Sequence, residues 1–167
     1  MSTPAIRRFP DPLLKQPTHP VERIDEAVRR FLDAMVRVMR SQPRCVGLAA
    51  PQIGSDLRIA VMDATGHPKT TDGHGLLLLV NPRILEGEGQ VVQREGCLSV
   101  PDFTGNVRRA ARVRLVALDR EGRSQEWRLD GFEAIIAQHE VDHLDGLLFL
   151  DRITDVKADL FKRKTYV

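Results

Sequence analysis

The sequence predicts a fold that mixes α-helices and β-strands, because segments with helical periodicity are separated by short runs of β-forming residues. The chain has 167 residues, of which 42% are hydrophobic and 29% charged, as in globular proteins with a substantial core. Apolar side chains recur at helical spacing near residues 21–40 and 130–145. The chain contains no repeat, linker or low-complexity segment. We therefore expect a single domain covering residues 1–167.

The first helix is predicted over residues 21–40. Apolar side chains recur there every three or four positions, with charged residues between them. Pro43 follows, and the residue before a proline avoids helical geometry, so the helix should end by Ser41 or Gln42. The small, glycine-containing segment 44–54 is typical of a shaped loop or an irregular strand.

Four short segments in the middle of the chain are rich in apolar and β-branched residues, which favours strands. Strands are expected at 57–63 and 76–80, within 107–118, and at 124–129. The segment 64–75 lacks periodicity and predicts a mobile surface loop. Asn81-Pro82 should stop the second strand, and a turn at 119–122 should make the last two strands a hairpin.

The second helix is predicted over residues 130–145. Asp130 and Glu133 have the spacing of a capping box at its start, and Gly146 is a plausible stop. A final short helix is expected from about 154 to 164. The second helix is the more informative of the two, since it carries a metal-binding pattern.

That pattern is His-Glu-x-x-His, within residues 138–143. On a helix, His139 and His143 lie one turn apart on the same face, so that both imidazoles can bind one metal ion. Glu140 lies beside them, where a carboxylate can accept a proton from water activated by a metal. The histidines continue an apolar stripe, and buried imidazoles need partners, which a shared metal supplies. The pattern therefore predicts a catalytic metal site.

A third ligand must come from elsewhere in the chain, because the other three histidines lie in polar or proline-flanked segments. Asp145, Asp151 and Asp155 are conceivable oxygen ligands. Cys97 is the better candidate, since Gly96 beside it allows a close approach of the backbone. The two cysteines of the chain do not form a disulfide framework. Two nitrogens and one sulfur leave a fourth position for water, as a catalytic site requires.

Three motifs together resemble the signature of the peptide deformylase family: GLAAPQ at 47–52, EGCLS at 95–99 and QHEVDH at 138–143. They occur in the order and spacing of the family, and the resemblance runs over residues 9–153. It implies an α+β fold, with antiparallel strands wrapped around a central helix that carries the His-Glu-x-x-His motif. It also implies a metal-dependent amidohydrolase that removes the N-formyl group from the initiator methionine of nascent polypeptides, releasing formate.

The resemblance implies one divalent ion per chain, Fe(II) in the cell and zinc, nickel or cobalt in purified protein. The implied ligands are Cys97, His139 and His143. Glu140 would hold the attacking water, accept its proton and deliver it to the leaving amine. The family pattern assigns stabilisation of the resulting oxyanion to the Gln52 side-chain amide and the Leu98 backbone N–H.

The same resemblance implies that the peptide docks as an added strand against backbone near Val46 and Gly96, with the Gly47 carbonyl accepting the formyl amide hydrogen. The methionine side chain needs an apolar pocket. Apolar residues one to two turns before His139 are placed to line it, with Val46 opposite. These residues are Phe132, Ile135 and Ile136.

Two acidic residues, Glu95 and Asp142, are expected to support this site from outside. We expect them to orient the metal ligands or to pair with an arginine such as Arg109.

Charge and hydropathy limit the expected partners. The net charge of +2 is too small to predict sequence-specific nucleic-acid binding. The longest strongly apolar run, 76–80, is far too short for a membrane span, and residues 1–12 lack the apolar run of a secretory signal. We expect a cytoplasmic monomer that acts on N-formylmethionyl nascent peptides. The basic residues near 157–164 predict at most a weak, transient contact with the ribosome.

Two other functions stay open at the level of sequence. A small endopeptidase can share the His-Glu-x-x-His motif, although Cys97 and Gln52 argue against it. A catalytically impaired, deformylase-like metal-binding protein is the second alternative. Only Cys45 favours it, because the family usually has a glycine at this position, two residues before Gly47. Cleavage of unformylated peptides would indicate the first alternative, and metal binding without turnover the second.

Overall fold

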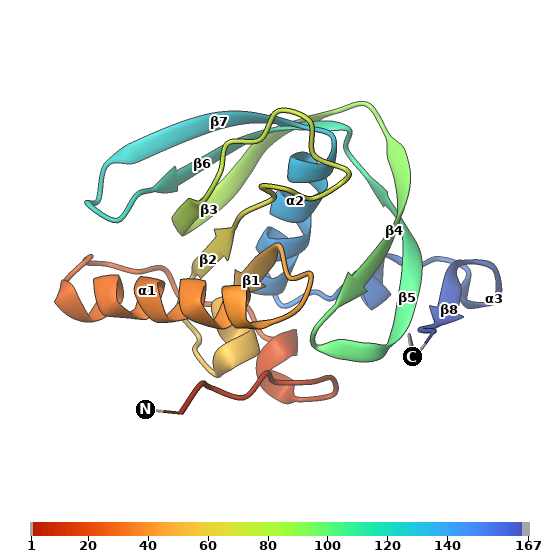
Figure 1. Ribbon diagram of the computed structural model, residues 1–167, viewed down its shortest axis with the longest axis horizontal. Coiled ribbons are helices and arrows are strands. Elements are labelled where there is room, and N and C mark those ends of the chain that lie inside the picture. Colours follow the sequence, from red (N-terminus) through yellow and green to blue (C-terminus); the bar gives the residue numbers. More distant parts are fainter. Residues whose placement is uncertain (1, 165–167) are drawn as a thin grey trace.

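The computed structural model describes residues 2–164 and has the predicted α+β architecture (Figure 1). One sheet has five strands in the order β1-β2-β3-β6-β7, the other has three in the order β4-β5-β8, and neighbouring strands are antiparallel. The strands are β1 (Gly47–Ala49), β2 (Ile59–Met62), β3 (Leu77–Glu88), β4 (Val91–Cys97), β5 (Val100–Arg109), β6 (Arg112–Leu118), β7 (Ser124–Asp130) and β8 (Leu160–Lys162). The helices are α1 (Glu26–Ser41), α2 (Phe132–Leu144) and α3 (Val156–Asp159), with 3₁₀ turns η1 (Pro12–Lys15), η2 (Ala50–Ile53) and η3 (Phe149–Arg152).

The five-stranded sheet is buried on both faces at β2, whose four residues are all buried. Successive side chains of a strand point to opposite faces. Ile59 and Val61 accordingly pack in one cluster with α1, whereas Met62 packs in another with α2. The two helices therefore cover opposite faces of this sheet, and no helix within residues 2–164 is long and apolar enough to cross a membrane.

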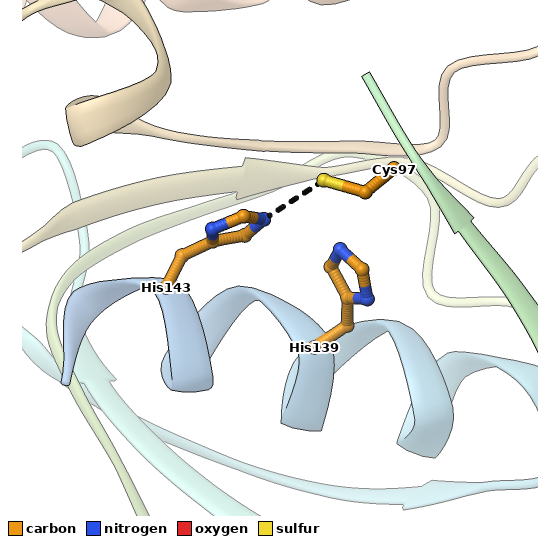
Figure 2. Close-up of side chains that lie close together, drawn as sticks. All are labelled: Cys97, His139 and His143. Atoms are coloured by element: carbon orange, nitrogen blue, oxygen red, sulfur yellow. Dashed lines mark hydrogen bonds between the residues drawn. The ribbon is translucent and has the colours of Figure 1, made fainter. Parts of the chain in front are cut away.

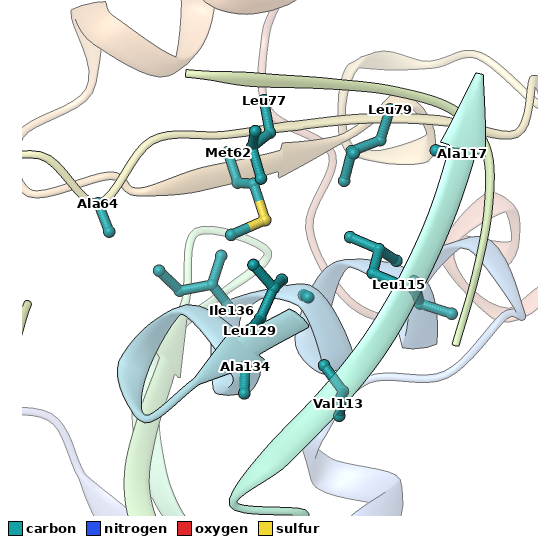
Figure 3. Close-up of a cluster of buried hydrophobic side chains, with 12 residues drawn as sticks. Met62, Ala64, Leu77, Leu79, Val113, Leu115, Ala117, Leu129, Ala134 and Ile136 are labelled. Carbon is teal, nitrogen blue, oxygen red and sulfur yellow. The ribbon is translucent and has the colours of Figure 1, made fainter. Parts of the chain in front are cut away.

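The α2 side of the sheet holds the largest cluster of buried apolar side chains (Figure 3). Strand residues such as Leu79 and Leu115, both without solvent exposure, contact helix residues such as Ala134 and Ile136. Small alanines on the helix allow it to lie close to the sheet. The remaining members are Met62, Ala64, Leu77, Val113, Ala117, Leu129, Ala137 and Val141. This packing holds α2, and the histidines on it, at a fixed depth in the molecule.

The start of α2 differs from the sequence prediction. Asp130 does not cap the helix but is the last residue of β7, where it pairs with Arg112 of β6. The N-cap is Gly131, which has φ of 60° and makes no side-chain capping bond. Residues with a side chain rarely adopt this backbone conformation, so glycine makes the sharp change from strand to helix possible. Glu133 is not part of a capping box; its carboxylate accepts from the backbone N–H of His74 at 2.8 Å. The helix ends at Leu144, just before Gly146 with φ of 80°.

The first helix begins five residues later than predicted. Residues 21–25 precede it, and Asp25 caps it by accepting a hydrogen bond from the backbone N–H of Val28 at 3.0 Å. Its end at Ser41 agrees with the prediction from Pro43.

The prediction that Asn81-Pro82 would stop a strand is wrong, because β3 continues to Glu88 with a shift of register between Val80 and Arg83. Asn81 has φ of 53° and its side chain bonds both backbone groups of Val21, so an irregularity absorbs the proline without ending the strand. The predicted strand within 107–118 is two strands, β5 and β6, and the hairpin of β6 with β7 is confirmed.

The predicted helix at 154–164 is also wrong. Only Val156–Asp159 is helical, and Leu160–Lys162 instead forms β8 on the edge of β5. Asp155 caps this one turn of helix through bonds to the backbone N–H groups of Lys157 and Ala158.

Candidate metal centre and active site

Three side chains from two distant segments come together beside α2. The candidate ligand atoms of Cys97, His139 and His143 all lie within 4.8 Å of one another (Figure 2). The Cys97 Sγ lies 3.3 Å from His143 Nε2. Cys97 and His143 are 6% and 1% exposed, so these polar groups are almost removed from water. The three residues predicted as ligands are thus brought to one point.

The hairpin of β4 and β5 positions the sulfur. The two strands are joined by the tight turn Leu98-Ser99, and the register of their pairing shifts between Gly96 and Cys97. Such a shift changes the direction of a side chain relative to the regular strand. On the other side, a spacing of four residues places both imidazoles on the face of α2 that meets the turn. The geometry therefore combines a strand irregularity with simple helical periodicity.

A buried ionic network orients His139. Its Nδ1 lies 2.8 Å from Glu95 Oε1, which leaves Nε2 to face the cluster. Arg109 donates to both oxygens of Glu95, at 2.7 and 2.8 Å, and to Asp142 at 2.6 Å. Arg152 binds the same Asp142 carboxylate at 2.7 Å. The predicted pairing of both acids with Arg109 is confirmed; the contribution of Arg152 was not predicted.

This environment favours the ionised forms of two side chains. Burial opposes ionisation of Glu95, but the hydrogen bonds from Arg109 and His139 outweigh it and lower the pKa of this carboxyl to about 2. Burial likewise opposes ionisation of Cys97, yet the adjacent His143 and His139 hold the pKa of its thiol well below the usual range. The thiolate is the form of cysteine that binds metal.

Glu140 lies next to the cluster with little room to move. It is 4% exposed, and its Oε2 has no hydrogen-bond partner within residues 2–164. Its Oε1 lies only 2.6 Å from where a Cβ on Gly47 would be, so glycine is required there for the carboxylate to fit. Burial raises the pKa of Glu140 above its usual value. An unpartnered buried carboxylate of this kind can accept a proton from a molecule bound in the site.

The amide of Gln52 is turned toward the same point. Its Oε1 accepts from the backbone N–H of Ala49 at 3.0 Å, which fixes the orientation of the group. Its Nε2 therefore faces the turn, 3.2 Å from Ser99 Oγ and 3.6 Å from Cys97 Sγ. Ser99, fully buried, was not identified from the sequence; its position directly after the cysteine was the only available signal.

A cavity of about 320 Å³ opens onto these residues. Its lining includes every residue predicted to bind substrate, together with Leu98 and Cys45. The predicted substrate-binding residues are Val46, Gly47, Gly96, Phe132, Ile135 and Ile136. Both β1 and β4 are edge strands of their sheets and contribute to the lining, so unpaired backbone faces the cavity from both sides.

Cys45 makes a contact that the family's usual glycine would lack. Its Sγ donates to the carbonyl of Gly47 at 3.1 Å. The backbone N–H of Asp63 bonds the Val46 carbonyl across β1 and β2, so the Gly47 carbonyl, next along the strand, points away from β2. Burial, together with the nearby Glu140, raises the pKa of the Cys45 thiol to about 12. The thiol therefore stays protonated and covers an acceptor on the cavity wall.

The predicted loop at 64–75 has no regular structure, and part of it closes over one end of the cavity. The His67 ring stacks on Phe132 with 4.3 Å between centroids, and the Lys69 Nζ lies 5.6 Å from the same ring. His74 bonds Glu133 through Nδ1 at 2.7 Å. These contacts were not predicted, because nothing in the loop's own pattern indicates where it docks.

The three alternative oxygen ligands are engaged elsewhere. Asp145 pairs with Arg58 at 2.7 Å, Asp151 pairs with Lys15, and Asp155 caps α3. The cluster of one thiolate and two imidazoles therefore has no carboxylate ligand among these candidates. Its donor set fits a borderline divalent cation, and the unpartnered Glu140 Oε2 fits a water or substrate beside it.

Comparisons with known proteins agree with this geometry. Residues 4–159 match the model of the family described as polypeptide deformylase. A peptide deformylase of Syntrophobacter fumaroxidans is 41% identical over 159 residues, covering 95% of this chain and 91% of the relative. The peptide deformylase structure from Thermotoga maritima matches with a TM-score of 0.83 and 36% identity, covering 93% of this chain and all of that one. A peptide deformylase of Synechococcus elongatus, solved in complex with actinonin, matches with a TM-score of 0.82 and 35% identity, covering 91% of this chain and 79% of that one.

Proposed function

We propose a function from one premise: the chain belongs to the polypeptide deformylase family. The cavity beside α2 is where this enzyme hydrolyses the N-formyl group of nascent polypeptides. The products are formate and a peptide with a free N-terminal methionine. The observation that carries the assignment to this cavity is the position of Glu140, unpartnered and buried, beside the three converging ligand atoms.

The family is metal-dependent, and we propose Fe(II) as the cation bound by Cys97, His139 and His143, with zinc, nickel or cobalt able to replace it. When bound, a divalent cation acts as a Lewis acid that acidifies water and polarises a carbonyl. The Glu95 carboxylate supports the site by fixing the ring of His139 through its 2.8 Å contact with Nδ1.

Glu140 is the proposed proton carrier. Its carboxylate takes a proton from the attacking water and delivers it to the nitrogen of the leaving amine. Because burial raises its pKa, the protonated form after the first step is easier to reach than for an exposed glutamate. The fixed position of Oε1 against Gly47 keeps the carboxylate in place through both transfers.

Gln52 and Leu98 are the proposed donors to the oxyanion. The bond from Ala49 to Gln52 Oε1 orients the amide N–H groups toward Cys97 before the substrate arrives. Leu98 directly follows Cys97 in the turn, so its backbone N–H is close to the same point. Donors that are oriented in advance stabilise developing charge without the cost of reorganisation.

The peptide is proposed to lie between β1 and β4 as an added strand, because each offers an unpaired edge to the cavity. The Gly47 carbonyl would accept the formamide N–H, in competition with the Cys45 thiol. The side chain of methionine would enter the apolar part of the lining. Its proposed walls are Val46, Phe132, Ile135 and Ile136.

The proposed wider context is a cytoplasmic monomer, folded as one domain over residues 1–167, that meets its substrates in transient contact with the ribosome. These proposals follow from the substrate, since formylated N-termini arise on nascent chains.

The test is release of formate from a formyl-Met-Ala-Ser peptide by anaerobically prepared protein loaded with Fe(II), and separately with Ni(II). Glu140→Gln should retain the metal and lose at least about a hundredfold in kcat, since general-base catalysis contributes about that much. Glu126→Gln, on the exposed face of β7, is the matched control and should keep full activity.

A full complement of metal without turnover in the wild-type protein would refute the proposal for this substrate. It would favour a metal-binding protein impaired by the contact between Cys45 and Gly47. Cleavage inside an unformylated peptide would instead indicate an endopeptidase.

A further inference from the structure

Among residues 2–164, the mouth of the cavity carries exposed charges of only one sign. Of the acidic residues that line it, Glu95 and Glu140 are 6% and 4% exposed, and Glu95 is bound by Arg109. In the part of the chain that the structure describes, the exposed charged residues of the lining are all basic: Arg44, Lys69, Arg94 and Arg163. We refer to these four as the basic rim. The chain as a whole has 25 basic and 23 acidic residues, so this composition is a local feature of the cavity.

The basic rim is assembled from four separate segments. Arg44 precedes β1, Lys69 lies in the loop before β3, Arg94 is on β4 and Arg163 follows β8. Cations that converge on one opening from segments so far apart in the chain create a positive potential there, which a low-dielectric cavity wall strengthens.

Contacts within the fold hold Lys69, Arg94 and Arg163 in place. The Arg94 guanidinium stacks 3.7 Å above the Phe161 ring, and the Lys69 Nζ lies over Phe132. The Arg163 guanidinium occupies the space that a Cβ on Gly96 would need, so it lies against the edge strand β4. Because Arg163 is anchored by its backbone N–H on Asp102, it reaches this strand across β5.

The path of the substrate brings its second to fourth residues past the basic rim. In the proposed function, on which this inference rests, the formyl group lies at the buried ligands and the peptide runs outward between β1 and β4. Arg94 and Arg163 then lie on the β4 side of the peptide, Arg44 on the β1 side and Lys69 beside Phe132 of α2. We propose that this enzyme selects formyl-methionyl peptides with acidic residues among the second to fourth positions, where methionine is the first.

The expected effect is moderate, because exposed charges are hydrated and screened. An exposed ion pair changes binding by about twofold to fivefold. Replacing one lysine in the peptide by aspartate changes a repulsion into an attraction, so we expect about a tenfold difference in kcat/KM at low salt. At 0.5 M KCl the Debye length falls to roughly 4 Å, and most of the difference should disappear.

The experiment compares formyl-Met-Ala-Asp, formyl-Met-Ala-Asn and formyl-Met-Ala-Lys, all as C-terminal amides so that no terminal carboxylate contributes. The expected order of kcat/KM is Asp, then Asn, then Lys, with the difference in KM rather than in kcat. Arg163→Gln should reduce the ratio of Asp to Lys by about threefold. Arg83→Gln removes the same charge from an exposed position of β3 outside the lining, and should leave the ratio unchanged.

Lys69→Gln provides a second variant if Arg163→Gln is unstable in thermal unfolding, since the lysine lies in a loop. Equal kcat/KM for the three peptides, or equal reduction by Arg83→Gln and the rim variants, would overturn the inference while leaving the proposed function intact. No turnover of the neutral formyl-Met-Ala-Asn peptide would instead count against the proposed function itself.

Discussion

A methyl group added to Gly47 tests whether the position of Glu140 controls the reaction. In Gly47→Ala the new Cβ would lie 2.6 Å from Glu140 Oε1, 3.0 Å from Cδ and 3.1 Å from Cγ. Ordinary contacts between such atoms are about 3.5 to 4 Å, so the carboxylate must move by about 1 Å. Gly47 lies in the extended strand β1, paired with Met62, and alanine adopts this backbone conformation without strain.

The magnitude follows from the displacement. A catalytic group misplaced by about 1 Å can cost roughly a hundredfold in rate. The three heavy atoms nearest to the new methyl all belong to Glu140 and none to Cys97, His139 or His143, so metal binding should persist. We therefore expect Gly47→Ala to lose about a hundredfold in kcat while it retains a stoichiometric metal ion.

The assay measures formate release, metal content and thermal unfolding for Gly47→Ala and for the control Gly73→Ala. In the control, the added methyl meets the flexible Thr70 side chain at 3.1 Å, and neither Gly73 nor Thr70 belongs to the cavity lining. The control should keep its activity. Wild-type kcat in Gly47→Ala, with the metal bound, would refute the argument that this glycine holds the proton carrier in position.

Three further results are expected. Cys45→Ala frees the Gly47 carbonyl from its 3.1 Å hydrogen bond with the thiol, so KM should fall by about threefold. Cys45→Ser supplies a stronger donor and should raise KM. The opposite order would show that the thiol does not compete with the substrate. The Glu95 carboxyl has a pKa of about 2 in the folded protein, below its unfolded value. Its ionisation therefore contributes about 3 kcal/mol to the free energy of unfolding. This contribution is complete above about pH 4.5 and is lost as the pH falls toward 2. Urea unfolding at pH 6 and pH 3 should therefore show a smaller pH dependence for Glu95→Gln than for wild type, and identical slopes would contradict the ion-pair account. Chelation of the metal should abolish activity and lower Tm, and both should recover when a divalent cation is added back, as expected for a ligand that binds only the folded state.

Local patterns predicted those parts of the site that lie within one turn of helix or one short motif. His139 and His143 needed only the period of a helix to be placed on one face. Gln52 and Cys97 were identified from short motifs, and the structure brings both side chains to the same cavity. The pairing of Glu95 with Arg109 was also predicted, as one of two ways in which this acid could support the metal ligands.

Predictions failed where tertiary structure outweighed a local preference. Asp130 has the spacing of a helix cap, but its pairing in β7 left Gly131 to make the turn. Asn81-Pro82 is a strand breaker in most contexts, yet the bonds from Asn81 to Val21 accommodate it as an irregularity. Leu160 and Phe161 fit a helical or an extended period equally, and the free edge of β5 selected the strand.

The sequence by itself determined the chemistry of this protein: residue identity at short spacing specified the two imidazoles and the carboxylate beside them, and the resemblance of its motifs to a family indicated the thiolate and the amide. Only the tertiary structure decided how these groups meet other parts of the chain. The contact of Cys45 with Gly47 and the docking of the loop on Phe132 depend on packing between distant segments. The basic rim has the same origin, since its four cations are separated by up to 119 positions, from 44 to 163, and no periodic pattern connects them. Their convergence exists only because two sheets and one helix enclose a common cavity.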